Sequence, residues 1–412
     1  MGEARAALDA APIWRDPLDK RRLIRQALDD LGDKDPHLEA RLLAAYLNPA
    51  RMGRIEPAEA LRARERIGEL IAEHSFSDVE TQLLGSEAFE ALYSWRFDKA
   101  RLLLRQAHER FARTGDDTQA AGALSYCVDA ATFLGELGEA KGVVREAAAF
   151  ADDHGLRGWN EVCLCQLAVV ALVQGDVDAF EKFLKAPVTT EEVAVLAAAV
   201  RASRLEMGGD LSGALALLEG VPERTNDLDY RPAVHAVRAR ILLNAGRERE
   251  AGEERRRFLE FVRERELGPT FNGITFTWSL AALDEAIFDP PDPSLLAAVL
   301  QLSRHLDAEG LPAWVEYVSA RCTQRVFASV ELASGLLDEA EARFQRALEW
   351  CEREQCPIEA GRCLQGLAEI AQQRGDEAAA MAYLDRAGAL FSQYGAKLYL
   401  DRILAKKQIL KA

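Results

Sequence analysis

One short phrase recurs along this chain and constrains its fold more than any other feature. A small or turn-forming residue is followed five residues later by alanine, and an amphipathic run comes next. The examples are Gly53 to Ala58, Trp95 to Ala100, Gly135 to Ala140, Gly209 to Ala214, Gly246 to Ala251, Gly335 to Ala340 and Gly375 to Ala380. Gly175 belongs to the same series, with Phe180 at the alanine position. Self-similarity at a period of roughly 20–50 residues is typical of solenoid proteins.

The spacing of these anchor residues also reveals a unit without the phrase. Successive anchors are separated by 42, 40, 40, 34, 37, 89 and 40 residues. The separation of 89 residues is about twice the others, and the proline-rich stretch Asp289–Pro293 lies near its middle. Because proline ends helices but is tolerated in their first turn, we expect a corner here and a new helix from Ser294. The chain therefore contains about nine units, one of them inferred.

Each unit has the pattern of a helical hairpin. Before Gly135, the run Thr118–Leu134 carries apolar residues three and four positions apart, which gives a helix one apolar face. The anchor glycine is suited to a left-handed helix cap, and the alanine after it lets the second helix pack closely. No persuasive strand periodicity appears. We therefore predict an all-α fold of at least sixteen helices, no sheet, and anchor turns at Gly135, Gly175, Gly335 and Gly375.

A single hairpin cannot bury its apolar face alone, so the units are expected to stack into a superhelix in which each covers its neighbour. We expect residues 1–52 to form an N-terminal helical cap and residues 53–396 the repeats. The amphipathic segment 397–412 has no further anchor turn and is expected to be a C-terminal capping helix.

These phrases resemble tetratricopeptide (TPR) repeats, as in GLLDEAEARFQRALEWCE and RGDEAAAMAYLDRAGALF. The C-terminal stretch from EAGRCLQGLAEIAQQRGDEAAA onward is similar to the TPR-like region of MalT-like and LuxR-type bacterial signalling ATPases. The resemblance implies an α-solenoid that binds inducers or partner proteins. The chain departs from those relatives because it has neither a G-x-x-x-x-G-K-[S/T] phosphate loop nor a basic helix-turn-helix after Arg402.

Charge and composition limit which classes of partner and which cellular compartment are expected. The net charge of −16 opposes nucleic-acid binding, which depends on phosphate neutralisation. No stretch approaches 18 uninterrupted apolar residues, and no signal-peptide pattern opens the chain. Seven irregularly spaced cysteines do not form a secreted disulfide framework. We predict a cytoplasmic protein that binds neither membrane nor nucleic acid; the sequence carries no prediction of its oligomeric state.

Motifs for catalysis, metals and cofactors are sparse. No two of the six histidines lie within four residues of each other, which excludes a helical H-E-x-x-H zinc site. Cys163 and Cys165 would point to different sides of one helix, and we interpret the cysteines as buried apolar residues. Convergence of Cys351, Cys356 and Cys363 is the alternative. We predict no catalytic, cofactor or metal residues, and no enzyme. Arg255–Arg257, interleaved with glutamates, is expected to be a solvated, salt-bridged face.

Aromatic and amide side chains on the first helices of the hairpins carry the functional prediction. In TPR arrays, which the units resemble, these helices line a concave groove, where such groups suit a peptide or small ligand. The candidate groove residues are Tyr93, Tyr126, Trp159, Asn160, His235, Arg238, Asn244, Asn272, Trp278, Trp314 and Tyr317. The main hypothesis is a protein-interaction or ligand-sensing module of a bacterial regulatory system, binding a peptide, a partner domain or an inducer. The alternatives are a structural or oligomerisation scaffold, and an enzyme with a composite site.

Overall fold

The structure, a computed structural model, describes residues 17–47, 57–185, 188–221, 230–264, 293–308, 310, 315–316 and 321–411. Within these residues the chain forms nineteen α-helices, one 3-10 turn and one pair of two-residue strands. The all-α fold and the expected minimum of sixteen helices are confirmed. The Pro-rich corner at 289–292 lies outside the described residues, and the next helix begins at Pro293.

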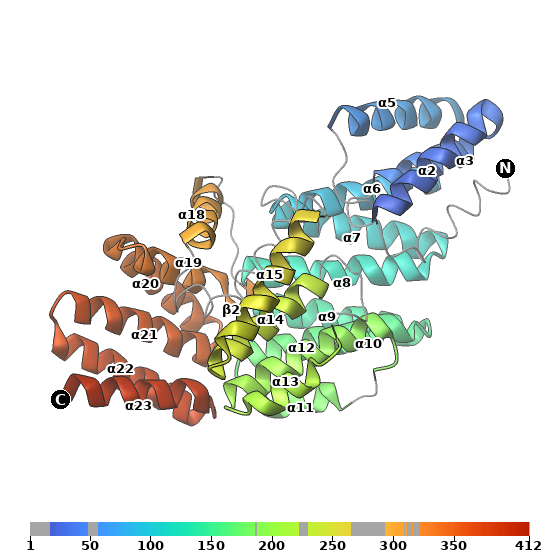
Figure 1. The fold of residues 1–412 in the computed structure, drawn as a ribbon. Helices are drawn as coiled ribbons and strands as arrows, with labels where there is room; N and C mark the ends of the chain where they lie inside the picture. Colours follow the sequence, from blue (N-terminus) through green and yellow to red (C-terminus); the bar gives the residue numbers. More distant parts are fainter. Residues whose placement is uncertain are drawn as a thin grey trace.

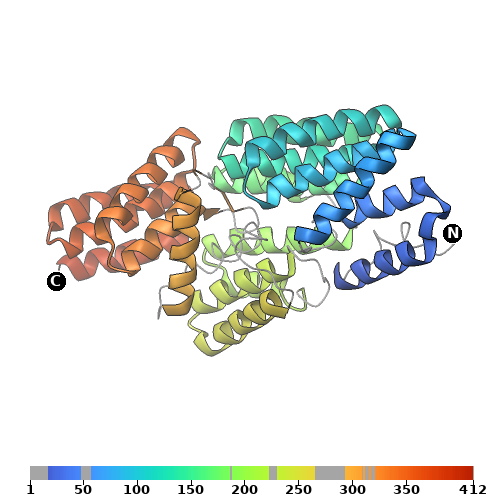
Figure 2. The same cartoon turned by 90° about the horizontal axis from the view of Figure 1, so that it is seen from above.

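The first group of elements runs from the N-terminus to the middle of the chain: α2 (Pro17–Leu31), η1 (Gly32–Lys34), α3 (Pro36–Tyr46), α5 (Pro57–His74), α6 (Ser77–Tyr93), α7 (Phe97–Thr114), α8 (Asp117–Leu134), α9 (Leu137–Asp153), α10 (Arg157–Val173), α11 (Val177–Leu184), α12 (Glu191–Met207), α13 (Leu211–Leu217), α14 (Tyr230–Asn244) and α15 (Glu248–Glu264). The second group completes the chain: α18 (Pro293–Ala308), β1 (Val315–Glu316), β2 (Arg321–Cys322), α19 (Thr323–Ala333), α20 (Leu337–Arg353), α21 (Pro357–Gln373), α22 (Glu377–Gln393) and α23 (Lys397–Lys411). Helices α2 and α23 lie at opposite ends of the molecule (Figures 1 and 2).

The anchor residues form the turns inside the hairpins, as predicted. At Gly135, the turn has two closing hydrogen bonds of 3.0 Å, from Gly135 N to the Thr132 carbonyl and from Glu136 N to the Ala131 carbonyl. These bonds satisfy carbonyls that the end of α8 would otherwise leave without partners. The described anchors all adopt left-handed backbone with φ between 62 and 85°, namely Trp95, Gly135, Gly175, Gly209, Gly246, Gly335 and Gly375.

The corners between hairpins have the same geometry as the anchor turns. Left-handed residues occur there too, at Ser75, Gly115, Gly155, Gln355 and Gly395. Turns therefore recur every 20 residues from 75 to 175 and again from 335 to 395. The anchors named from the sequence are only every second turn. Gly115 with Ala120 also fits the phrase, whereas Gly155 and Gly395 lack the alanine and Ser75 and Gln355 stand where glycine would be expected.

The alanines that follow the anchors lie at the closest contacts between helices. Ala100, Ala140, Ala214, Ala340 and Ala380 are each 0% exposed. At these positions a larger side chain would meet the facing helix. The complete burial of these alanines agrees with the close-packing role inferred from the repeat.

One expectation was wrong, because the described residues include a small sheet. Strands β1 and β2 pair antiparallel, with Val315 opposite Cys322 and Glu316 opposite Arg321. The ladder is only two residues long on each side, too short for a period-2 pattern to appear in the sequence. It leaves the all-α class unchanged.

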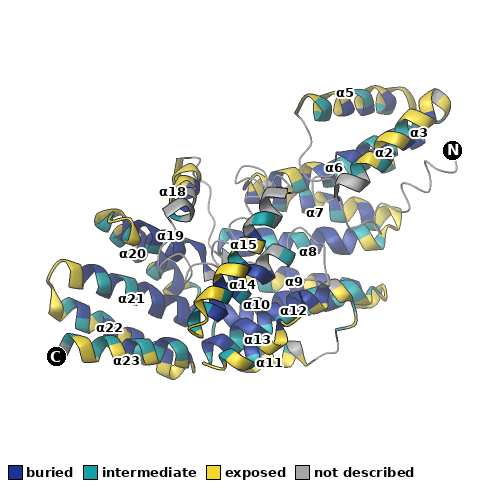
Figure 3. Cartoon of the chain, viewed as in Figure 1, coloured by how far each residue is buried: buried dark blue, intermediate teal, exposed yellow. Residues whose placement is uncertain are grey.

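The two helices of a regular hairpin differ in burial. Helix α8 is buried on all sides from Ala120 to Phe133, apart from half-buried Tyr126 and Asp129. Helix α9 buries only one stripe, as a helix on an outer layer does. Figure 3 shows this contrast in the colouring of the ribbon. The first helices therefore form an inner layer and the second helices cover it.

The apolar core is continuous from Ala88 in α6 to Ile403 in α23. Two smaller clusters lie nearer the N-terminus, one between α2 and α3 and one among α3, α5 and α6. Residues 48–56, which include the boundary expected at 52, are outside the described part of the chain. The division into an N-terminal cap (1–52), repeats (53–396) and a C-terminal capping helix (397–412) stays a prediction.

Candidate binding surfaces

The structure describes the side chains of six of the eleven predicted groove residues. Asn272, Trp278, Trp314 and Tyr317 lie outside the described residues, and so does the side chain of Tyr93. The six others are on first helices, as expected, but their surroundings differ. They are Tyr126, Trp159, Asn160, His235, Arg238 and Asn244.

The two aromatic residues of this group pack between helices. A Cβ atom on Gly122 of α8 would lie 2.9 Å from Trp159 Cζ2, so the indole fits against a glycine that leaves room for it. Tyr126 meets Phe89 edge to face, with ring centroids 4.6 Å apart. Both side chains remain half-buried. These contacts give them packing roles, and ligand contact by either one stays a prediction.

Asn160 lines an open hollow of about 300 Å³ beside Glu161. The Glu161 carboxylate accepts hydrogen bonds from Thr189 N at 3.1 Å, Thr189 Oγ1 at 2.6 Å and Thr190 N at 2.9 Å. Burial favours the neutral carboxyl, but these hydrogen bonds outweigh it and lower the pKa of Glu161 to about 2. Glu161 therefore ties α10 to the segment that begins α12.

His235 belongs to a buried polar network. Its Nδ1 lies 2.8 Å from Glu254 Oε2, and the residues are each 4% exposed. Because a carboxylate only accepts hydrogen bonds, the proton lies on Nδ1. Arg238 Nη1 is 3.6 Å from Glu254 Oε1, and Arg257 Nη1 is 3.0 Å from the same oxygen. Burial raises the pKa of Glu254, but the hydrogen bond from His235 and the nearby arginines lower it overall.

Asn244 connects a buried ion pair to the far end of the chain. Its Nδ2 donates to Glu206 Oε1 over 2.7 Å, and its Oδ1 accepts from Arg402 Nη2 over 2.6 Å. Glu206 also accepts from Arg240 Nε at 2.9 Å, and both side chains of that ion pair are 0% exposed. Asn244 is thus a structural link between α12, α14 and α23.

The arginine triplet in α15 does not lie wholly on a solvated face. Arg256 is exposed and forms an i,i+4 pair with Glu260 at 2.8 Å, as expected. Arg257, however, reaches Glu254, which is buried rather than solvated because it bonds His235. Arg256 therefore forms a surface pair, and Arg257 a link to the interior.

A more informative pattern appears when the hairpins are aligned on their anchor residues. The position eight residues before the anchor holds a buried apolar residue in α8, α10, α19 and α21: Cys127, Leu167, Phe327 and Leu367. In α6 the same position holds exposed Glu87, and in α12 and α14 it holds Arg201 and Arg238, both half-buried. We call these two residues the arginine pair. The sequence analysis included Arg238 but missed Arg201, although the spacing from the anchors would have found it.

The regular hairpins show what covers this position. Cys127 of α8 lies between α7 and α9, where Arg105 and Glu146 are its charged neighbours. Those two residues come ten and eleven positions after their own anchors, Trp95 and Gly135. A second helix must therefore extend at least about ten residues past its anchor, roughly three helical turns, to cover the position.

The second helices before and after Arg201 in the chain are too short to do so, whereas Arg238 is preceded by the short α13 but followed by the 17-residue α15. Helix α11 ends at Leu184, nine residues after Gly175, and α13 ends at Leu217, eight residues after Gly209. The helical cover present around Cys127 thus stops before Arg201. A half-buried arginine suits such a place, because its methylene stem can pack on apolar surface while its charged end lies nearer the molecular surface.

A second feature is a long-range contact, which we call the junction, between the middle hairpins and the C-terminal helices. Trp350 Nε1 donates to the Gly135 carbonyl over 3.0 Å, and Gln174 Nε2 donates to the Glu354 carbonyl over 2.9 Å. Helix α21 also contacts α10, and α23 contacts α12 (Figures 1 and 2). The expectation that each unit covers only its neighbours was therefore incomplete.

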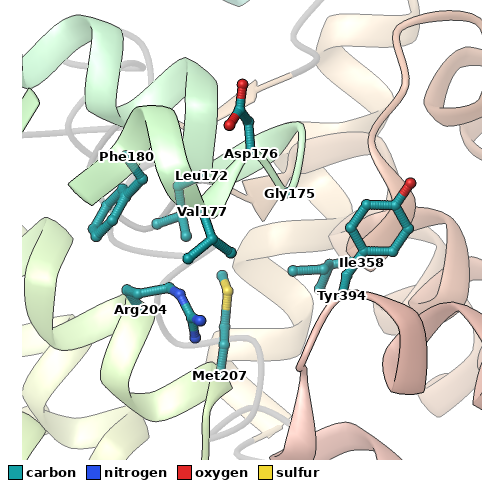
Figure 4. A pocket seen from close by; sticks show the side chains of 9 residues that line it. All are labelled: Leu172, Gly175, Asp176, Val177, Phe180, Arg204, Met207, Ile358 and Tyr394. Carbon is teal, nitrogen blue, oxygen red and sulfur yellow. The ribbon is translucent and has the colours of Figure 1, made fainter. Parts of the chain in front are cut away.

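An apolar crevice lies in the junction (Figure 4). Its volume is about 10 Å³, close to the minimum that holds one water molecule. In Figure 4, Arg204 and Met207 extend into it from α12, and the Asp176 carboxylate points away from it. The apolar lining comes from Leu172, Val177, Phe180, Met207, Ile358 and Tyr394.

The cysteines have the environment of core residues. All seven are buried and free. Burial raises the pKa of the Cys127, Cys163 and Cys165 thiols to about 12, which keeps them protonated. Within the part of the chain that the structure describes, no group of three or more His, Cys, Asp or Glu residues is placed to hold a metal ion. No described helix combines the length and apolar character needed to cross a bilayer.

Comparison with known proteins adds little to this picture. No protein-family model matches the sequence, and no curated protein matches it. Among solved structures, one similar chain is a Rap protein crystallised with the competence and sporulation factor. The two share 13% sequence identity over 96% of this chain and 99% of that one, with a TM-score of 0.44. At this level the likeness carries no functional argument. The assignment as a TPR-like helical repeat rests on the hairpins and turns described above, and membership among the MalT-like or LuxR-type regulators is not shown.

Proposed function

We propose that this protein is an interaction module that binds an acidic segment of a partner protein on α12 and α14. The arginine pair carries this proposal. Arg201 and Arg238 occupy equivalent positions on consecutive first helices, where four other hairpins hold buried apolar residues. Arginine is enriched at protein interfaces because its guanidinium forms paired hydrogen bonds with carboxylates.

The spacing of the pair suits an extended peptide. Packed helices lie about 8–10 Å apart, and an extended chain advances about 3.3 Å per residue. Carboxylates about three residues apart would therefore reach both arginines at once. Glu254 lies 3.6 Å from the Arg238 guanidinium and restricts its position, so a peptide carboxylate would share that guanidinium with Glu254.

The charge of the whole chain limits how a partner can bind. The chain carries a net charge of −16, so an acidic partner is repelled at long range and would have to bind through local contacts with the two arginines. Nucleic acid would meet the same repulsion over a longer contact. We extend the proposal to a cytoplasmic regulatory protein without catalytic activity, as the resemblance to signalling regulators implies. Binding elsewhere along the first helices and a purely structural scaffold are its rivals.

Charge reversal tests the proposal. The variant Arg201→Glu with Arg238→Glu and the wild type are titrated with a short labelled peptide whose glutamates are about three residues apart. Fluorescence anisotropy should show saturable binding to the wild type, weakened by increasing salt and lost in the variant. A peptide of the same composition with lysine replacing glutamate should bind neither protein.

The control is Arg256→Glu, because Arg256 is an exposed arginine whose side chain is 62% accessible on the nearby helix α15. It should bind the acidic peptide almost as the wild type does. Circular dichroism and thermal melting must show that all three proteins fold. Equal affinity of the wild type and the double variant would refute the proposed site, and the scaffold alternative would gain support if the wild type bound no peptide.

A further inference from the structure

The junction places the half-buried Arg204 side chain beside an apolar crevice, and no ion pair to it occurs among the described residues. Arg204 Nε is buried and donates no hydrogen bond within the described part of the chain. Around it, Met207 comes from its own helix, Val177 and Phe180 from α11, and Ile358 and Tyr394 from the C-terminal helices. A buried donor without an acceptor is unfavourable, because it has lost its water without compensation.

The contacts around the crevice come from two parts of the chain that are far apart in the sequence and share one apolar core. Pro357 and Tyr394 approach Gly175 so closely that a Cβ atom there would lie 3.0 Å from Pro357 Cγ and 2.8 Å from Tyr394 Cδ1. Neighbouring hairpins in a solenoid interdigitate over whole helices, whereas here helix ends meet turns. Separation at this place would leave the stacking within each group of hairpins intact.

We propose that the crevice is a binding site for a carboxylate attached to a small branched or aromatic apolar group. The carboxylate would accept from the Arg204 guanidinium, and the apolar group would lie among Val177, Phe180, Met207 and Tyr394. This inference rests on the proposed role as a binding module, but it uses a different site from the arginine pair.

The charge of the crevice favours a carboxylate over a phosphate. One guanidinium balances one negative charge, whereas a phosphate dianion would leave a second charge among apolar side chains. Asp176, at the edge of the crevice, adds a further negative group. A monoanion with a compact apolar body is therefore the best match.

The closed crevice, at about 10 Å³, is too small for such a ligand. Binding therefore requires that Ile358 and Tyr394 move away from Val177, which would loosen the junction. A ligand that binds only the open arrangement shifts the protein toward it, and so changes how the two groups of hairpins are oriented. Ligand binding at this site would in this way change the shape of the solenoid.

The experiment compares an acid with its amide. Calorimetric titration of the full chain with 4-methylpentanoate and with 4-methylpentanamide separates recognition of the charge from recognition of the apolar group. A second pair, a peptide ending in leucine as the free acid and as the amide, distinguishes a small metabolite from a peptide C-terminus. At least one acid should bind, and its amide should bind about tenfold or more weakly, as the loss of a charge-assisted hydrogen bond predicts.

Variants and a structural readout complete the test. The Arg204→Met variant should bind the acid only as weakly as the wild type binds the amide. The Arg256→Met variant should bind the acid with unchanged affinity. Hydrogen exchange should become faster at the beginning of α21 when the acid is bound. The inference is overturned if neither acid binds at millimolar concentration, if acid and amide bind equally, or if Arg204→Met binds the acid as the wild type does. The comparison of acid with amide uses the wild-type protein alone. It contains no glutamate-rich peptide, so a negative result would overturn this inference without affecting the proposed binding at the arginine pair.

Discussion

The middle and C-terminal hairpins are built from the same repeat, but their second helices differ in length. Helices α20 and α22 have 17 residues each, whereas α11 has eight and α13 has seven. Where the second helices are long, the facing position holds buried Phe327 and Leu367. It holds Arg201 between the short α11 and α13, and Arg238 between α13 and the 17-residue α15. The two arginines therefore lie on the first helices on either side of α13, the shortest second helix among the described residues.

The physical reason concerns how far the second helix shields this position from water and how polar the side chain there is. A long second helix excludes water from the first helix, and an apolar side chain then gains most from burial. The length of one second helix does not decide this alone, because Leu167 is 8% exposed although α11 in its hairpin has only eight residues. The same short helices lie next to the junction, since the turns at Gly175 and Gly209 both approach the C-terminal helices.

The largest expected effect concerns the buried ion pair that supports the middle hairpins. Replacing Arg240 by Met leaves the Glu206 carboxylate buried beside Ser203 and Asn244 without its main positive partner. Breaking a buried pair in this way costs about 3–5 kcal/mol of unfolding free energy. Urea denaturation of the variant and the wild type measures the difference.

The double variant Arg240→Met with Glu206→Leu provides the control. It removes both charges, so we expect it to recover most of the lost stability. If Arg240→Met costs less than about 1 kcal/mol, the pair does not stabilise the middle hairpins in the way described.

A matched pair of glycines measures the contribution of the junction. Gly175 and Gly375 have left-handed φ of 68 and 79°, so alanine at either position costs about 1–2 kcal/mol. A Cβ on Gly375 would meet no atom within 4 Å, whereas one on Gly175 would strike Tyr394. Gly175→Ala should therefore lose about 1–3 kcal/mol more than Gly375→Ala in the same denaturation experiment. Equal losses would mean that the junction contributes nothing.

The smallest effect compares close packing in the two kinds of hairpin. Ala340→Leu should overpack α19 against α20 and cost about 1–3 kcal/mol. Ala214→Leu should cost less, because α13 has only seven residues and can shift with less disruption. Thermal melting of both variants tests this. An unchanged melting curve for Ala340→Leu would show that the alignment of the repeats is misplaced.

Much of the fold follows from the sequence because local rules determine it. Gly135 and Gly375 mark turns by their backbone freedom, and Ala140 and Ala380 mark close contacts by their size. The corners at Ser75 and Gln355 are harder to predict, since these residues adopt positive φ without being glycine. The two-residue ladder of β1 and β2 leaves no periodic pattern at all.

The candidate surfaces depend on longer-range geometry and were only partly predictable. Trp159 was selected for its chemistry, but whether an indole meets a ligand or Gly122 depends on the neighbouring helix. Arg201 was detectable by counting back from its anchor. The junction was not, because small rotations between successive hairpins add up to decide which distant turns meet.

Hydrogen exchange with and without the acidic peptide tests the central claim most directly, namely that the irregular middle hairpins carry the binding surface. The account predicts slower exchange in α12 and α14 around Arg201 and Arg238 when the peptide is bound. Exchange in α19 and α21, where Phe327 and Leu367 occupy the same position, should not change. Protection confined to the C-terminal hairpins, or protection spread equally over both regions, would contradict it.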